Sequence, residues 1–194
     1  MLVGTKVVLE EIDPTSIEQM RVWRNDPALR KFFREWKDIS KDKQAQWYKE
    51  RGNNTHPNHI YFQIMAIPKI PTLINPEFYD IDRRVLIGCC GILNIDWRVR
   101  SGELSIFIQP DYHGKGCGKE TLTLLMRYAF EEVNLHKFWG ECYSSNNAIE
   151  LYRKVGFKDD GMIRDSWYYD GKYGNSYAFS ILEDEWRELY MDRK

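Results

Sequence analysis

The sequence predicts an α/β (α+β) fold in which a single mixed sheet of about seven strands is flanked by helices. Short apolar or alternating runs, typical of strands, interchange with segments whose apolar residues recur at helical spacing. A helical segment lies between two strand candidates in the middle of the chain, which is typical of a parallel βαβ unit. The 194 residues fit one domain with a sizeable core, so we expect residues 1–194 to form that domain.

The first third of the chain predicts a strand, two helices and a second strand. Apolar residues at helical spacing follow Pro14, and the breaker Asn25-Asp26-Pro27 ends that helix. Ser40 is a candidate N-cap of the second helix, which is expected to end near Gly52. The expected elements are a strand at 6–10, helices that start near residues 17 and 41, and a strand at 61–67.

Residues 68–83 contain Pro68, Pro71 and Pro76 and show no clear period, so they predict a long loop or an insertion. Strand patterns resume after this segment, and a broad apolar helical face runs from Leu122 to Val133. Asp170-Gly171 is a typical hairpin turn between two closing strands. The expected elements are strands at 85–93, 103–108, 137–143, 161–169 and 176–182, and a short helix at 148–155.

Bulk properties exclude several classes of protein. A net charge of −1 without a basic block does not indicate nucleic-acid binding. The chain has no apolar run long enough for a membrane span and nothing that reads as a signal peptide, so we expect a cytoplasmic protein without a membrane partner. The four cysteines form no CxxC pair, and we expect no metal site.

The most informative segment is His113-Gly114-Lys115-Gly116-Cys117-Gly118, which stands just before the helical face. Alternating glycines let the backbone turn its N–H groups outward, and a helix that opens there adds unpaired N–H groups and the positive end of its dipole. The segment therefore predicts an anion site, most naturally for a pyrophosphate. It is not a P-loop, because Gly-x-x-x-x-Gly-Lys-Ser/Thr is absent. It is not a good Rossmann fingerprint either, because it follows the fourth expected strand.

Two segments carry a resemblance to a known family. Glu103 to Glu120 comprises a strand, a turn, the glycine loop and a helix start, and Asn146 to Phe157 follows about thirty residues later. Together they resemble the GNAT superfamily of acetyl-CoA-dependent N-acetyltransferases, whose loop reads Gln/Arg-x-x-Gly-x-Gly/Ala. Gly116 and Gly118 occupy its two glycine positions, whereas His113 stands where Gln or Arg is commonest.

The start of the chain narrows the resemblance. Trp23-Arg24-Asn25-Asp26-Pro27, Ile39-Ser40 and Trp47-Tyr48 are similar to the branch that holds ribosomal-protein N-terminal, spermidine and nucleotide-amino-sugar acetyltransferases. The resemblance implies direct transfer of the acetyl group of acetyl-CoA to a primary amine through a ternary complex. The acceptor is then a small-molecule amine, an amino sugar or a protein N-terminus.

The family also implies how acetyl-CoA would bind. The pantetheine arm would lie along the strand at Ile106, Phe107 and Ile108, with further contacts from His113 and Asn146. The pyrophosphate would meet the N–H groups of the loop and helix start, contributed by Gly114, Lys115, Gly116, Cys117, Gly118 and Lys119. His113 could equally be a surface histidine, and Asn146 and Ser144 could instead cap the following helix.

Acetyl transfer to an amine needs a base for the ammonium and an acid for the leaving thiolate. The resemblance implies Tyr152 as the general acid and Glu103 as the base, acting through water; Glu141 and Asp96 are further acidic candidates. The alternatives are a core aromatic for Tyr152 and a solvated strand carboxylate for Glu103.

Two alternative functions share this fold: a CoA-binding regulatory module without catalysis, and a transferase for a different acyl-CoA such as succinyl-CoA. The high aromatic content and the apolar residues near the C-terminus are compatible with a homodimer.

Overall fold

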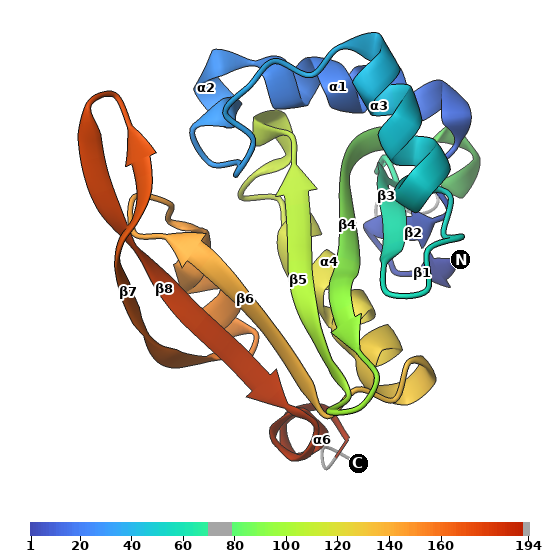
Figure 1. Ribbon diagram of the computed structural model, residues 1–194. Helices are drawn as coiled ribbons and strands as arrows, with labels where there is room; N and C mark the ends of the chain where they lie inside the picture. Colours follow the sequence, from blue (N-terminus) through green and yellow to red (C-terminus); the bar gives the residue numbers. More distant parts are fainter. Residues whose placement is uncertain (70–78, 192–194) are drawn as a thin grey trace.

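The computed structural model describes residues 1–69 and 79–191. They form one eight-stranded mixed sheet with the strand order β1-β2-β3-β4-β5-β6-β8-β7 (Figure 1). The predicted fold class is therefore confirmed. The count exceeds the expected seven because β1 (Leu2–Val3) is only two residues long, too short to leave a sequence pattern.

The first five strands form an antiparallel meander. Strand β2 (Val7–Glu10) pairs with β3 (Ile60–Ala66), which pairs with β4 (Val85–Asp96), and β4 pairs with β5 (Ser101–Ile108). Alternating side chains of β4 and β5 face the helices on the two sides of the sheet. The pattern of buried residues in β3 and β4 explains why both were visible in the sequence.

Three helices separate β2 from β3 and lie over one end of β4 and β5 (Figure 1). They are α1 (Ile17–Asn25), α2 (Pro27–Arg30) and α3 (Lys41–Trp47), the last extended by a π-helical turn at Tyr48–Gly52. Ser40 caps α3 as expected, because its side chain accepts a hydrogen bond from the Lys43 N–H. Asp26-Pro27 ends α1 but also starts α2, since the Asp26 side chain caps the Ala28 N–H.

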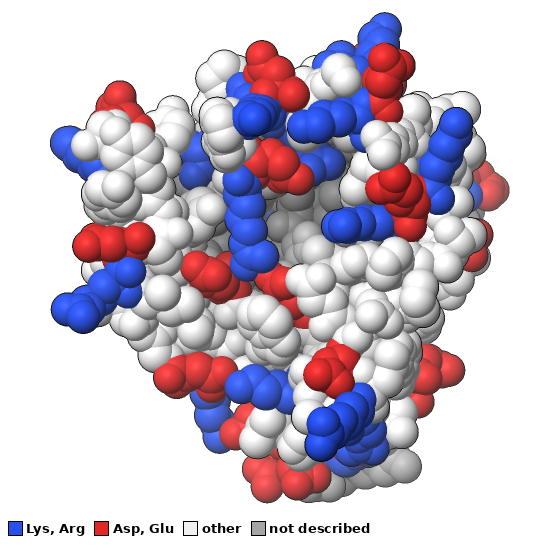
Figure 2. Space-filling model, viewed as in Figure 1, with Lys and Arg blue, Asp and Glu red and all other residues white. Residues whose placement is uncertain are grey.

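The parallel strands β5 and β6 (Lys137–Tyr143) pair at one end only. Their register runs from Ser101↔Lys137 to Glu103↔Trp139, and beyond Glu103 the two strands diverge (Figure 1). The residues around this divergence line a cavity of about 420 Å³ that is seen as a central hollow with charged side chains at its rim (Figure 2). The divergence therefore opens a cleft in the middle of the sheet.

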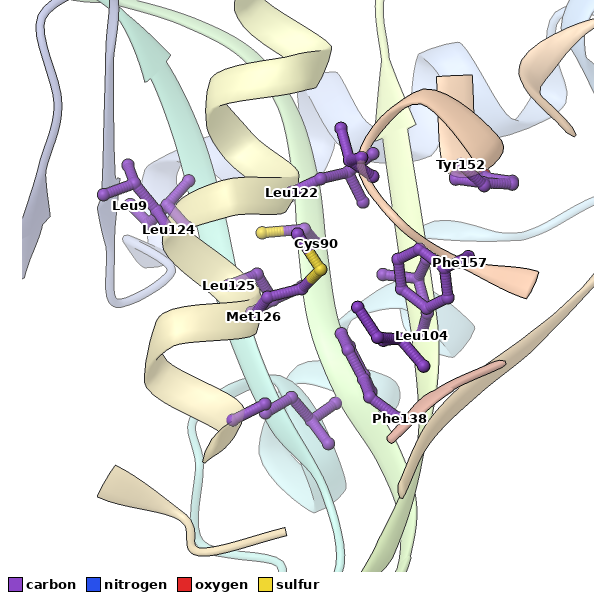
Figure 3. Packing of buried hydrophobic residues seen from close by; sticks show 14 of the residues in the cluster. Leu9, Cys90, Leu104, Leu122, Leu124, Leu125, Met126, Phe138, Tyr152 and Phe157 are labelled. Atoms are coloured by element: carbon purple, nitrogen blue, oxygen red, sulfur yellow. The ribbon is translucent and has the colours of Figure 1, made fainter. Parts of the chain in front are cut away.

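Helix α4 (Cys117–Arg127) packs on the sheet face opposite the N-terminal helices and continues as a π-helical turn at Tyr128–Glu132. Its side chains Leu122, Leu125 and Met126 are fully buried and meet Cys90 and other strand residues (Figure 3). Each such burial stabilises the fold by about 1.5–3 kcal/mol. The packing fixes α4, and with it the glycine loop, beside β5.

The C-terminal part forms a long hairpin and two helices. Asp170 and Gly171 both have positive φ, which confirms the predicted turn between β7 (Lys158–Tyr169) and β8 (Lys172–Leu182). Both strands are longer than expected. For β7 the prediction was too short because most of its residues are exposed and give little apolar pattern. Helices α5 (Ala148–Lys154) and α6 (Glu183–Tyr190) precede and follow this hairpin.

The proline-rich segment at 68–83 is described only at its two ends, and Pro71 and Pro76 lie outside the described residues. Lys69 and Tyr79 form an isolated antiparallel bridge, and Ile81–Arg83 form a short 3-10 helix. Among residues 1–69 and 79–191, no helix is both long enough and apolar enough to cross a membrane.

Candidate active site

The cavity at the divergence of β5 and β6 gathers several residues that the sequence singled out. Glu103, Ile106, Phe107, Asn146 and Tyr152 all line it. They come from β5, from the turn after β6 and from α5, which are far apart in the chain. Ile108, the last residue of β5, is buried and stands outside the lining.

Glu103 lies at the last paired position of β5, where the cleft begins. The residue is only 4% exposed, so it is not a solvated strand carboxylate. The Asn94 side-chain amide donates a hydrogen bond to one carboxylate oxygen over 2.6 Å, and a guanidinium nitrogen of Arg34 lies 2.6 Å from the other. The N-terminal helices cover this face of β5, as Trp23 packing on Phe107 shows, which explains the burial.

Arg34 bridges two carboxylates across the cleft. The guanidinium nitrogen that contacts Glu103 also lies 3.5 Å from Glu141 on β6. Burial by itself would lower the pKa of Arg34, but the negative charges of Glu103 and Glu141 outweigh it and raise the pKa, so the group stays charged. Arg34 lies between α2 and α3 and carries no sequence signal that could have placed it here.

Asn94 owes its position to an irregularity in β4. The register of β4 with β5 shifts between Leu93 and Asp96, and Asn94 has a φ of 49°. Its N–H donates to Nδ1 of His59, while its side chain holds Glu103. Burial is the main reason that the pKa of His59 is lowered, so this imidazole is neutral. The predicted strand ended at Leu93, one residue before Asn94, so no sequence signal pointed to this residue.

Tyr152 is buried in a ring stack at the base of the cleft. Its ring lies 4.5 Å from that of Phe179 at an angle of 24°, and the residue is 8% exposed. Among the described residues its hydroxyl has no hydrogen-bond partner, although it borders the cavity. Burial, assisted by the nearby Cys142 thiol, raises the pKa of Tyr152 well above its usual value. The phenol therefore holds its proton at neutral pH.

The glycine loop has the conformation that an anion site requires. Gly114 and Gly116 have φ values of 73° and 88°, and α4 begins at the next residue, Cys117. In the described part of the chain, hydrogen-bond acceptors are absent for the N–H groups of Gly114, Lys115, Gly116, Gly118 and Lys119. Free N–H groups at a helix N-terminus bind anions. Burial raises the pKa of the Cys117 thiol, so this side chain is not a thiolate.

Contacts behind the loop hold it in place. Nε2 of His113 lies 2.7 Å from the carbonyl oxygen of Ile108, which ties the loop to the end of β5. The Lys6 ammonium donates to the carbonyl of Lys115 over 3.0 Å. Glu120 accepts hydrogen bonds from the N–H groups of residues 5–7 and from the Thr5 hydroxyl. The N-terminal strand and the loop are thus joined.

Other predicted residues have local structural contacts. The Asn146 side chain accepts a hydrogen bond from the Ala148 N–H at the start of α5, while the residue also borders the cavity. The backbone N–H of Ser144 donates to Asn175 on β8. Asp96 accepts from two N–H groups of the β4–β5 turn and does not line the cavity. No group of three or more metal-binding side chains exists in the described ranges.

The parallel strands β5 and β6 diverge, and the glycine-rich start of α4 follows β5. The family of acetyltransferase (GNAT) domains matches residues 6–158, which is most of the chain. The chain belongs to this family and is an N-acetyltransferase. The resemblance seen in the loop and in α5 is therefore confirmed.

The chain is similar to spermidine N(1)-acetyltransferase of Escherichia coli, with 30% identity over 145 residues that cover 69% of this chain and 78% of that one. It is 29% identical over 103 residues to the putative ribosomal N-acetyltransferase YdaF of Bacillus subtilis, covering 52% and 56% of the two chains. The crystal structure of spermidine N-acetyltransferase from Vibrio cholerae in complex with CoA and spermine has a similar fold. Its TM-score is 0.81 at 20% identity, over 94% of this chain and 99% of that one.

Proposed function

We propose that the protein transfers the acetyl group of acetyl-CoA directly to a primary amine bound in the same complex. The observation that carries this proposal is the convergence of Glu103 and Tyr152 on one cavity, at the point where β5 and β6 diverge. A carboxylate and a protonated phenol are the base and the acid that this reaction needs.

The donor would be held by the glycine loop and by β5. The free N–H groups at residues 114–116, 118 and 119 fit a pyrophosphate. Within the described residues, nothing beyond the neighbouring loop residues lies within 4 Å of a Cβ built on Gly114, so the loop is open to a ligand. Beyond Glu103, β5 pairs with β4 alone among the described strands, which leaves its other edge free at Ile106, Phe107 and Ile108. A pantetheine amide could pair with that edge as an added strand.

The proposed reaction breaks the thioester C–S bond and forms an amide C–N bond. Glu103, which lies in contact with Arg34, accepts the proton of the acceptor ammonium through water. The free amine then attacks the thioester carbonyl, and Tyr152 gives its proton to the leaving thiolate. The nitrogen loses its second proton as the amide forms, and this proton restores the Tyr152 phenol, directly or through water. The hydroxyl of Tyr152 has no protein acceptor among the described residues, so its proton is available for this transfer.

An acceptor screen tests the proposal. The purified protein is mixed with acetyl-CoA or succinyl-CoA and with simple amines, amino sugars, polyamines and peptides, while released thiol and product mass are followed. We expect an acetamide and an equal amount of free CoA. CoA binding without turnover of any amine would favour the regulatory module instead, and turnover with succinyl-CoA alone would favour a different acyl donor.

We also propose that the protein forms a homodimer or larger assembly through the β7–β8 hairpin. β7 is an edge strand, and Tyr168 and Tyr173 on this hairpin are 62% and 69% exposed. Exposed edge strands and large apolar side chains are typical of association surfaces. A solved structure of spermidine N-acetyltransferase from Vibrio cholerae is described as dodecameric.

A further inference from the structure

The charges that line the cleft are balanced. Of the residues that the structure describes, three arginines and three glutamates border the cavity, namely Arg24, Arg34, Arg51, Glu35, Glu103 and Glu141. His59 also borders it and is neutral because burial lowers its pKa. A polyamine carries several ammonium groups, so its site needs more carboxylates than cationic groups. The described lining of this cleft has equal numbers of the two.

The carboxylates of the cleft are already paired. Glu35 forms an ion pair with Arg24, and Glu103 and Glu141 share Arg34. Since Glu103, Glu141 and Arg34 together carry one net negative charge, they can balance a single ammonium group. This position lies where β5 and β6 diverge, which is where the acceptor nitrogen must be for acetyl transfer under the proposed function.

Arg51 and the unused donors of Arg34 are free to bind an anionic group. Arg51, in the π-helical turn after α3, borders the same cavity and has no ion-pair partner in the described part of the chain. One terminal nitrogen of Arg34 makes both of its ion-pair contacts, and its side chain is 57% exposed. A second ammonium group on the acceptor would meet these cations, whereas a carboxylate or phosphate would pair with them.

From this charge arrangement we infer that the acceptor is an amine that also carries an anionic group, a carboxylate or a phosphate, and that polyamines are poor acceptors. The single ammonium binds beside the Glu103–Arg34–Glu141 group, and the anionic group pairs with Arg51 and with the free donors of Arg34. This inference rests on the proposed function and narrows its substrate class.

Matched acceptors test the inference. Butylamine, diaminobutane and γ-aminobutyrate share one chain length and differ in the distal group, which is apolar, cationic or anionic. Longer ω-amino acids with their matching diamines, spermidine and an amino-sugar phosphate extend the series. We expect kcat/KM with acetyl-CoA to be at least about tenfold higher for the best anionic acceptor than for its matching diamine, as for a charge-assisted contact.

Two variants test which arginines cause the expected preference for anionic acceptors. Arg51→Gln should lower kcat/KM for the anionic acceptor about tenfold and leave butylamine unchanged. Arg34→Gln should raise kcat/KM for the diamine relative to the anionic acceptor, because it frees a carboxylate. Arg98→Gln is the control, since Arg98 is exposed in the β4–β5 turn and does not border the cavity.

The outcomes separate this inference from the proposed function. If spermidine or a diamine is acetylated as well as or better than every anionic acceptor, the inference is wrong while the proposed function stands. The inference is also wrong, and the proposed function still stands, if Arg51→Gln lowers kcat/KM for butylamine and for the anionic acceptor equally. If no amine at all is acetylated, the proposed function itself is wrong.

Discussion

Replacing Tyr152 with phenylalanine removes one hydroxyl and keeps the ring that stacks on Phe179. Within the described residues the hydroxyl has no protein partner, so the free energy of unfolding should change by less than about 1 kcal/mol. If Tyr152 is the acid, kcat should nevertheless fall by about 10²- to 10⁴-fold, the usual contribution of a positioned general acid. This variant should therefore lose activity while its stability stays nearly unchanged.

Tyr190→Phe is the matched control. Its hydroxyl donates to the carbonyl of Val155 over 3.0 Å, away from the cleft. Removing it should cost about 1 kcal/mol of unfolding free energy and leave kcat unchanged. Each variant loses a single hydroxyl, but Tyr152→Phe should lose activity and Tyr190→Phe should lose stability.

The assay follows thiol release at saturating acetyl-CoA and acceptor, together with urea unfolding of both variants. A Tyr152→Phe protein with wild-type kcat would refute the assignment of Tyr152 as the acid. A fall in kcat that tracks an equal loss of stability would refute the reasoning as well, because it would show a structural role.

Gly116→Ala should raise the KM for acetyl-CoA about tenfold without changing the KM for the acceptor, since the φ of 88° strains any other residue; steady-state kinetics check this. For Glu120, burial opposes ionisation, but hydrogen bonds from residues 5–7 outweigh it and lower the pKa. Because the folded pKa lies below the unfolded one, this carboxylate stabilises the fold above the ordinary glutamate pKa of about 4.3, and Glu120→Gln should cost about 2 kcal/mol at neutral pH. That loss should shrink as the pH falls below about 4, as unfolding curves at several pH values would show. Tyr173→Glu should lower the molar mass measured by light scattering, and an unchanged mass would argue against association through the hairpin.

The sequence pattern predicted the parts of the fold that have strong periodicity. Helix α4 was visible because its buried residues recur on one face, and the β7–β8 turn was visible because Asp-Gly favours positive φ. Strand β1 and the full length of β7 were not predictable, since one is two residues long and the other lacks buried residues.

For the candidate site, the family resemblance indicated Tyr152, Glu103 and the glycine loop, and the first two border the cavity. The resemblance did not indicate Arg34, because a loop residue reaches the cleft only through the packing of α1 to α3 over β5. It also missed Asn94, whose role depends on a register shift in β4 that is set by tertiary pairing. The inferred acceptor class depends on Arg34 and Arg51, which the sequence did not single out.

The structure of the protein with CoA bound tests the central claim most directly. We expect the pyrophosphate to accept hydrogen bonds from the N–H groups of residues 114–119, and the sulfur to lie within hydrogen-bond reach of the Tyr152 hydroxyl beside Glu103. CoA bound elsewhere, or a sulfur atom that points away from the divergence of β5 and β6, would contradict the account.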